Sequence, residues 1–229
     1  MVNDKAIYKH AFWLYGVIIG LAIKQAFEAV VPHWIHPTTE SQHLQLGLFL
    51  EILRFFTFLF LTIRFYLGSA YYFGLAHEAE EAETEFPKRN FATDFVLGFI
   101  HFLGFVFAGW AVGVHSEMRL FPLALIFILG YDLVWFVMTR NLDTTDLIKW
   151  WAIVNGVVLG FCVLLYLVVE RVTTNVHLSE ICALVVVFVT TLLDIGWMMQ
   201  KKPFFEPVRD WIVGTRRRHD AQPPTVKPS

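Results

Sequence analysis

Long apolar stretches alternate with short polar segments along most of the chain. Six of the stretches are long enough for a membrane-spanning helix, which needs roughly 20 mostly apolar residues to cross about 30 Å of hydrocarbon. They predict transmembrane helices at roughly 11–31, 44–67, 94–114, 120–139, 148–169 and 179–199. We therefore expect residues 1–199 to form an all-α, integral membrane helical bundle with six transmembrane helices.

The composition agrees with a membrane protein. Hydrophobic residues make up 56% of the 229 residues and charged residues 17%, against roughly 45–50% and about 25% in soluble domains. The net charge of −2 gives no overall basic footprint, so we expect no nucleic-acid partner. The sequence contains no P-loop, no dinucleotide fingerprint and no His-Glu-x-x-His motif, and it does not predict an enzyme.

Basic residues are unevenly distributed between the two sides of the predicted bundle. Thirteen of the 18 Lys and Arg residues lie in the N-terminal segment, near 68–93 and 140–149, and in the C-terminal tail. The loops on the opposite side carry only Arg119 and Arg171. Because cytoplasmic segments are enriched in Lys and Arg, both termini are predicted to be cytoplasmic, in a plasma membrane or a bacterial inner membrane.

An acidic segment at residues 77–85 follows the second predicted span. It contains five glutamates and is rich in helix-forming residues. It is either a solvated extension of the second helix or a docking surface for a cytoplasmic protein partner.

Residues 200–218 are predicted to form a cytoplasmic, amphipathic helix at the membrane interface. Aromatic residues lie on one helical face, and basic residues at its ends suit anionic membrane lipids. The residues expected at the lipid surface are Phe204, Phe205, Trp211, Arg216, Arg217 and Arg218. Residues 219–229 have the composition of a disordered tail.

Three ionisable residues are predicted at similar depth, near the cytoplasmic ends of the even-numbered spans: Arg64, Asp132 and Asp194. A charge inside a bilayer costs about 2.5–3.5 kcal/mol at the helix centre, so such residues persist when they are paired, hydrated or needed for function. The cluster is therefore either a staple that fixes how three helices pack or a cation or proton site.

Two further pairs lie at mid-depth in the first two spans. Lys24 and Glu28 are four residues apart, and Glu51 and Arg54 three apart, so each pair shares a helical face. The pairs either neutralise themselves within one helix or line a polar path between the helices, which His101 and Asn155 could join. The set added to the candidate ion site is Lys24, Glu28, Glu51, Arg54 and His101.

Five of the nine histidines are predicted on the outer side: His33, His36, His43, His115 and His177. Imidazole is a ligand for several divalent metals, and carboxylates such as Glu180 can complete a coordination shell. The histidines would hold a divalent metal, sense pH or be unrelated interfacial residues. No other cofactor is predicted.

Glycine pairs four residues apart occur in the first, third and fifth predicted spans. Such pairs let helix backbones approach closely, and we expect them to serve contacts between copies in a homo-oligomer. They are Gly16 and Gly20, Gly109 and Gly113, and Gly156 and Gly160.

These patterns favour a membrane channel or small transporter for a cation or proton, because carboxylates recur at two depths of the bundle. The alternative is a non-conducting sensor, anchor or effector subunit that works with a cytoplasmic partner. A third hypothesis is a metal-dependent intramembrane enzyme that uses the outer histidines.

Overall fold

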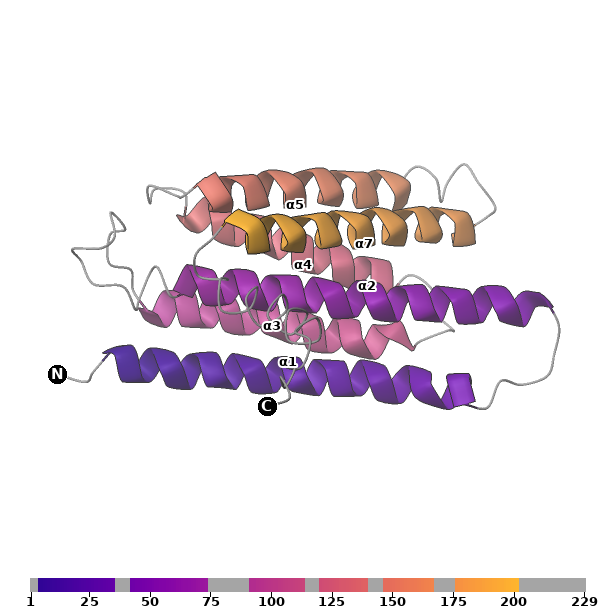
Figure 1. The fold of residues 1–229 in the computed structure, drawn as a ribbon, viewed down its shortest axis with the longest axis horizontal. Coiled ribbons are helices and arrows are strands. Elements are labelled where there is room, and N and C mark those ends of the chain that lie inside the picture. Colours follow the sequence, from indigo (N-terminus) through magenta and orange to yellow (C-terminus); the bar gives the residue numbers. More distant parts are fainter. Residues whose placement is uncertain are drawn as a thin grey trace, which may run out of the picture. The chain divides into compact units, whose positions relative to one another are not determined.

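The computed structural model describes residues 4–35, 42–73, 91–113, 120–139, 146–166 and 176–201. This part of the chain is helical and contains no strand, which confirms the predicted all-α class. The helices are α1 (Asp4–Ile35), α2 (Gln42–Phe73), α3 (Phe91–Val112), α4 (Leu120–Thr139), α5 (Asp146–Leu164) and α7 (Val176–Lys201) (Figure 1).

Five helices are long and apolar enough to cross a membrane. Their apolar segments are Phe12–Pro32, Leu46–Phe73, Phe91–Val112, Leu120–Met138 and Leu178–Met199. The apolar part of α5, Lys149–Leu164, is shorter. At 1.5 Å per residue it extends about 24 Å, less than the hydrocarbon thickness of about 30 Å. The chain therefore has the helices of a polytopic membrane protein, while the sixth span and the orientation of the termini stay predictions.

Helices α1 and α2 are longer than the predicted spans. α1 continues through Pro32 to Ile35, and α2 ends at Phe73 rather than near residue 67. The apolar segment of α2 itself continues to Phe73, so the prediction ended this helix too early, where Gly68 and Ser69 interrupt the run of large apolar residues. The additional two turns matter because they carry Ser69 and Tyr72, which are both buried.

The chain divides into two compact units, Met1–Thr191 and Leu192–Ser229, with the boundary inside α7. The acidic segment 77–85, residues 202–218 of the predicted interfacial helix and the tail 219–229 lie outside the described residues. The predictions for these segments remain predictions.

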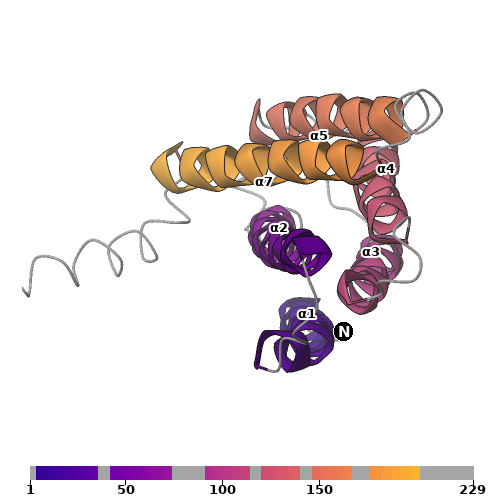
Figure 2. The ribbon, with the colours of Figure 1, turned by 90° about the vertical axis from the view of Figure 1, so that its right-hand side faces the viewer.

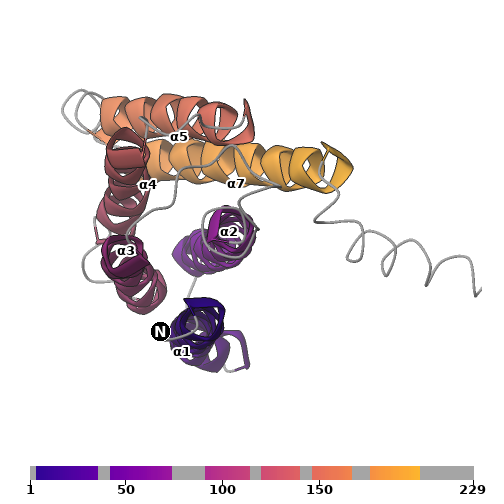
Figure 3. The same cartoon turned by 90° about the vertical axis from the view of Figure 1, so that its left-hand side faces the viewer.

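Helix α2 is the central helix of the first unit. α1 packs against α3, α3 against α4 and α4 against α5, and α2 contacts both α1 and α3. Views from the two ends show α2 beside this row of helices (Figures 2 and 3). Side-chain contacts described below join α2 to α4, α5 and the first part of α7 as well.

Aromatic rings fill the core between α1, α2 and α3. The ring centroids of Tyr15 and Phe102 are 4.7 Å apart, and those of Phe65 and Phe105 are 5.5 Å apart. The Tyr15 hydroxyl donates a hydrogen bond of 2.7 Å to the carbonyl oxygen of Phe95, which satisfies its polar atom inside the bundle. Large apolar side chains also lie exposed on the helices, as Trp13 does at 70%, and such surfaces suit lipid.

One glycine pair marks a close crossing of α1 and α3. A Cβ atom on Gly109 would lie 2.5 Å from the carbonyl oxygen of Ala22, and one on Gly113 would overlap the Cβ of Ala29. This pair therefore serves packing within one chain rather than the predicted contact between copies. Gly20 and Gly160 have no such neighbour within 4 Å.

Substituting Gly109→Ala should destabilise the bundle by about 1–3 kcal/mol, because the added methyl group overpacks the contact with the α1 backbone. The measurement is the free energy of unfolding in mixed micelles with increasing SDS. Gly160→Ala is the matched control, since alanine in an open helical position favours helix formation by up to about 1 kcal/mol. Equal effects of the two substitutions would contradict the close crossing.

Candidate functional site

A chain of buried hydrogen bonds joins three helices of the first unit. Arg64 of α2 donates from Nη1 to Oδ1 of Asn155 on α5 at 2.7 Å. The Nδ2 of Asn155 in turn donates to Oδ2 of Asp132 on α4. The exposed fractions are 2% for Arg64, 0% for Asn155 and 8% for Asp132. A neutral amide thus bridges a buried cation and a buried anion.

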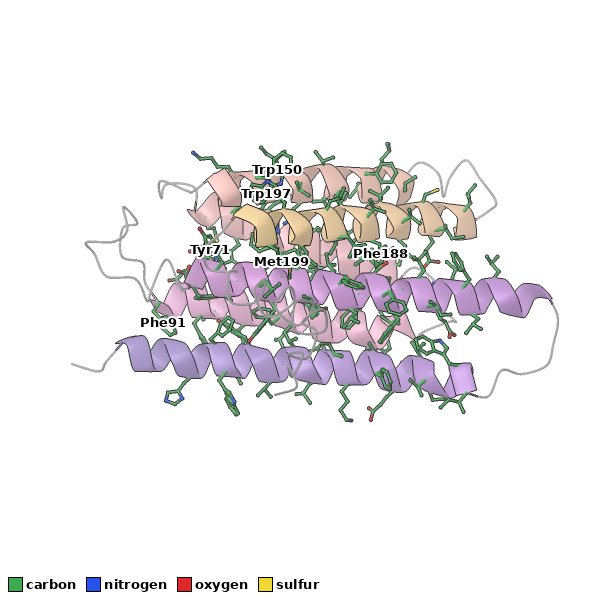
Figure 4. The ribbon with its side chains drawn as sticks, viewed as in Figure 1. Tyr71, Phe91, Trp150, Phe188, Trp197 and Met199 are labelled. Atoms are coloured by element: carbon green, nitrogen blue, oxygen red, sulfur yellow. The ribbon has the colours of Figure 1, made fainter. Side chains whose placement is uncertain are left out.

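Aromatic rings surround the Arg64 guanidinium. Its Cζ lies 5.1 Å from the ring centroid of Phe65 and 5.3 Å from that of Trp151, within the range of a cation–π interaction. The Trp151 ring packs directly over Gly68, where a Cβ atom would overlap it. By contrast, Trp150, which Figure 4 labels on α5, is 46% exposed. Gly68 therefore makes the space that brings Trp151 to the charged chain.

A second polar contact lies at the same end of the helices. The Tyr72 hydroxyl, near the end of α2, donates to Oδ2 of Asp94 at 3.3 Å. Asp94 is fully buried in the first turn of α3, where the helix dipole favours a negative charge. Counted as ionised, Arg64, Asp94 and Asp132 have a formal charge of −1.

A small pocket opens beside these contacts, between α2, α4 and α5. Its lining consists of Ser69, Tyr72, Asp132, Trp135, Phe136, Trp151 and Ala152. The cavity volume is about 40 Å³. A water molecule needs roughly 10–15 Å³ by this measure, so the pocket holds about three. It therefore offers one carboxylate, two hydroxyl groups and four aromatic rings to a small ligand.

His101 connects α3 to the same region of α4. Its Nε2 lies 3.2 Å from the carbonyl oxygen of Ile128, one helical turn before Asp132. Since a carbonyl only accepts, Nε2 carries the proton in this contact. The imidazole stacks on Tyr131 at 5.6 Å and is fully buried among aromatic rings. These contacts make His101 a packing residue that holds the turn of α4 bearing Asp132.

The opposite end of α2 carries a direct ion pair. Arg54 Nε donates to Oε1 of Glu180 on α7 at 2.5 Å, and both side chains are 3% exposed. Glu51, one turn earlier on α2, is also buried. Phe60 and Phe188 extend this α2–α7 contact, with ring centroids 5.5 Å apart (Figure 4). Glu180 thus neutralises an arginine, and this differs from its predicted role beside a metal.

The other predicted site residues fall into three groups. Lys24 and Glu28 form an ion pair of 2.8 Å along α1, with side chains 64% and 62% exposed, so they do not line a path toward α2. Asp194 is buried, but it belongs to the second unit. The side chains of the outer histidines lie outside the described residues: His33, His36, His43, His115 and His177. Within the described ranges, no group of three or more His, Cys, Asp or Glu residues could hold a metal ion.

Several residues of the site escaped sequence analysis. Asp94 stood at the first position of a predicted span and resembled an ordinary helix boundary. Asn155 was expected with the mid-depth groups, whereas it bridges Arg64 and Asp132. Trp135 and Trp151 carried no signal that distinguishes a pocket wall from a residue facing lipid.

No protein-family model, no curated protein and no solved structure matches this chain. The function must therefore be argued from the site itself.

Substituting Glu180→Gln should destabilise the protein by about 3 kcal/mol, because it leaves the Arg54 guanidinium buried without its anionic partner. Glu51 is buried one turn before Arg54 on α2, where its carboxylate can offset part of the guanidinium charge. We therefore expect a loss of stability at the lower end of the range for a broken buried ion pair. The measurement is SDS unfolding in mixed micelles.

Two comparisons test the assignment of this ion pair. The double variant Arg54→Met with Glu180→Met should recover most of the stability, since an apolar pair replaces a buried ion pair at little cost. Glu28→Gln breaks an exposed pair and should change stability by no more than about 1 kcal/mol. A large effect of Glu28→Gln with a small effect of Glu180→Gln would reverse our interpretation.

Proposed function

We propose that this chain is a small membrane carrier for a cation or proton, with Asp132 as the binding carboxylate. One observation carries the proposal: Asp132 lines a pocket and accepts a hydrogen bond from Asn155, which itself accepts one from the buried Arg64. A transport site needs a carboxylate that can alternate between an internal partner and a cargo.

The surroundings of Asp132 explain why it suits this role. Asn155 donates to one carboxylate oxygen, Oδ2, and the same carboxylate belongs to the pocket lining. Counted as ionised, Arg64, Asp94 and Asp132 have a formal charge of −1, which favours binding of a positive charge near the pocket.

The interior of α2 favours a carrier over an open channel. Arg54 and Arg64 are ten residues apart, or about 15 Å along the helix. Between them, Phe55, Phe58 and Leu61 are buried and apolar, and the hydroxyl residues Thr57 and Thr62 are buried as well. The Thr62 hydroxyl donates to the carbonyl oxygen of Phe58 within the helix. The large apolar side chains of this segment support a cargo at Asp132 that exchanges with one side at a time.

The alternative is a non-conducting sensor or effector subunit. One observation favours it: both charged contacts of α2, Arg54–Glu180 and Arg64–Asn155–Asp132, form within a single chain. In that case the polar chain would stabilise one of two helix arrangements, and binding at the pocket would shift their populations.

Flux measurements in liposomes distinguish these functions. The purified protein should carry protons or monovalent cations down an imposed gradient, reported by an enclosed pH dye and a potential-sensitive dye. Asp132→Asn should lower the flux about tenfold or more, because it removes the charge while keeping an acceptor for the Asn155 amide.

Glu28→Gln is the matched control, since it neutralises an exposed carboxylate outside the site and should retain the flux. Unfolding curves establish that each variant is folded. Unchanged flux in folded Asp132→Asn would overturn the role of Asp132. Absence of flux in the unsubstituted protein would overturn the carrier and support the sensor.

A further inference from the structure

The pocket beside Asp132 has an unusual combination of walls for a cation site. Tyr72, Trp135, Phe136 and Trp151 contribute aromatic rings, and Asp132 contributes a carboxylate. Among the described residues of the lining, no other side chain is charged. We propose that this pocket binds a small organic ammonium ion, with the rings as a cage and Asp132 as counter-ion.

The lining disfavours a bare metal ion. Its side chains offer four oxygen atoms, two from Asp132 and one each from Ser69 and Tyr72. Ca²⁺ requires about 6–8 oxygen ligands and Mg²⁺ about six in near-octahedral geometry. A metal would therefore retain water in a space that holds only about three water molecules. An alkylammonium ion requires no such shell, because its methyl groups are satisfied by ring faces.

Aromatic walls and a carboxylate attract an ammonium ion in complementary ways. The negative faces of Trp and Tyr rings bind cations, and quaternary ammonium groups are commonly held in such aromatic cages. The Trp151 ring already contacts one cation, since the Arg64 guanidinium lies 5.3 Å from its centroid. Asp132 adds a full negative charge at the pocket wall and offsets the arginine.

The size of the pocket limits the ligand. A cavity of about 40 Å³ suits a compact methylated ammonium group, with up to four methyl-sized substituents, rather than a whole amino acid. Either a free methylated amine or the headgroup of a choline lipid presents this group. Both ligands share the alkylated ammonium group, and the experiments below distinguish the free amine from the lipid.

This inference rests on the site proposed above, but binding can be measured without transport. Tetramethylammonium chloride is titrated into the full-length protein in a maltoside detergent, at constant ionic strength with sodium chloride. We expect a saturable rise in melting temperature and a saturable change in tryptophan fluorescence. Neutral tert-butyl alcohol, which has a similar shape but no charge, should produce neither.

Two variants test the two parts of the cage. Asp132→Asn should weaken tetramethylammonium binding roughly tenfold or more by removing the counter-ion. Phe136→Leu should weaken it about fivefold, because it removes one ring face at similar volume. Phe127→Leu makes the same exchange on α4 at a side chain that is 45% exposed and outside the pocket, and should bind normally.

The outcomes separate this proposal from the carrier. Flux of protons or alkali cations without saturable tetramethylammonium binding would overturn the ammonium site and retain the carrier. Binding that is equal in Phe136→Leu and Phe127→Leu, or equally strong for tert-butyl alcohol, would also overturn the cage. Binding without any flux would support the ammonium site and remove the carrier.

Nanodiscs distinguish the two sources of the ligand. If lipid headgroups occupy the pocket, phosphatidylcholine should raise the melting temperature and weaken tetramethylammonium binding relative to phosphatidylglycerol, and Phe136→Leu should reduce both effects. If the ligand is a free amine, its affinity should be equal in the two lipids. Either result supports the ammonium cage, whereas no binding in both lipids would contradict it.

Discussion

The free energy required to keep charge away from water determines much of how this chain packs. Arg64 is 2% exposed in a helix that is apolar enough to cross a membrane, where an unpaired charge costs about 2.5–3.5 kcal/mol or more. Asn155 accepts from Arg64 with its oxygen and donates to Asp132 with its nitrogen, so one amide uses both of its polar ends. Because the three residues lie on α2, α5 and α4, a shift of any one of these helices would break a buried hydrogen bond.

The aromatic core follows from the same constraint. Trp151 lies close to the guanidinium because Gly68 has no side chain, and its ring then forms a wall of the pocket. His101 fixes α3 to the α4 turn next to Asp132 through the carbonyl of Ile128. The pocket thus lies between the Trp151 ring, which packs beside the Arg64 guanidinium, and the Asp132 carboxylate of α4.

The sequence predicted the charges of the site better than their partners. Arg64 and Asp132 were identifiable because ionisable residues in apolar stretches are rare, and helix rise alone places them at similar depth. The partner of each charge depends on how every helix is rotated about its axis, which hydropathy does not determine. For this reason Glu180 was associated with the outer histidines although it neutralises Arg54, and the uncharged Asn155 was assigned to the wrong layer. Asp194 remains a prediction as a member of the inner cluster.

The two charged contacts of α2 differ in a way that bears on function. Arg54 and Glu180 touch directly, so each charge is offset at contact distance and little of the carboxylate's field extends beyond the pair. Asp132 accepts a hydrogen bond from the neutral Asn155 amide, and it lines a pocket whose described wall residues include no Lys or Arg. A direct pair serves packing best, since any opening leaves two bare charges. The Asp132 carboxylate, by contrast, can turn toward a ligand in the pocket while Asn155 keeps its hydrogen bond to Arg64. This difference along a single helix is the physical reason for placing the binding site at Asp132 and a structural clamp at Arg54.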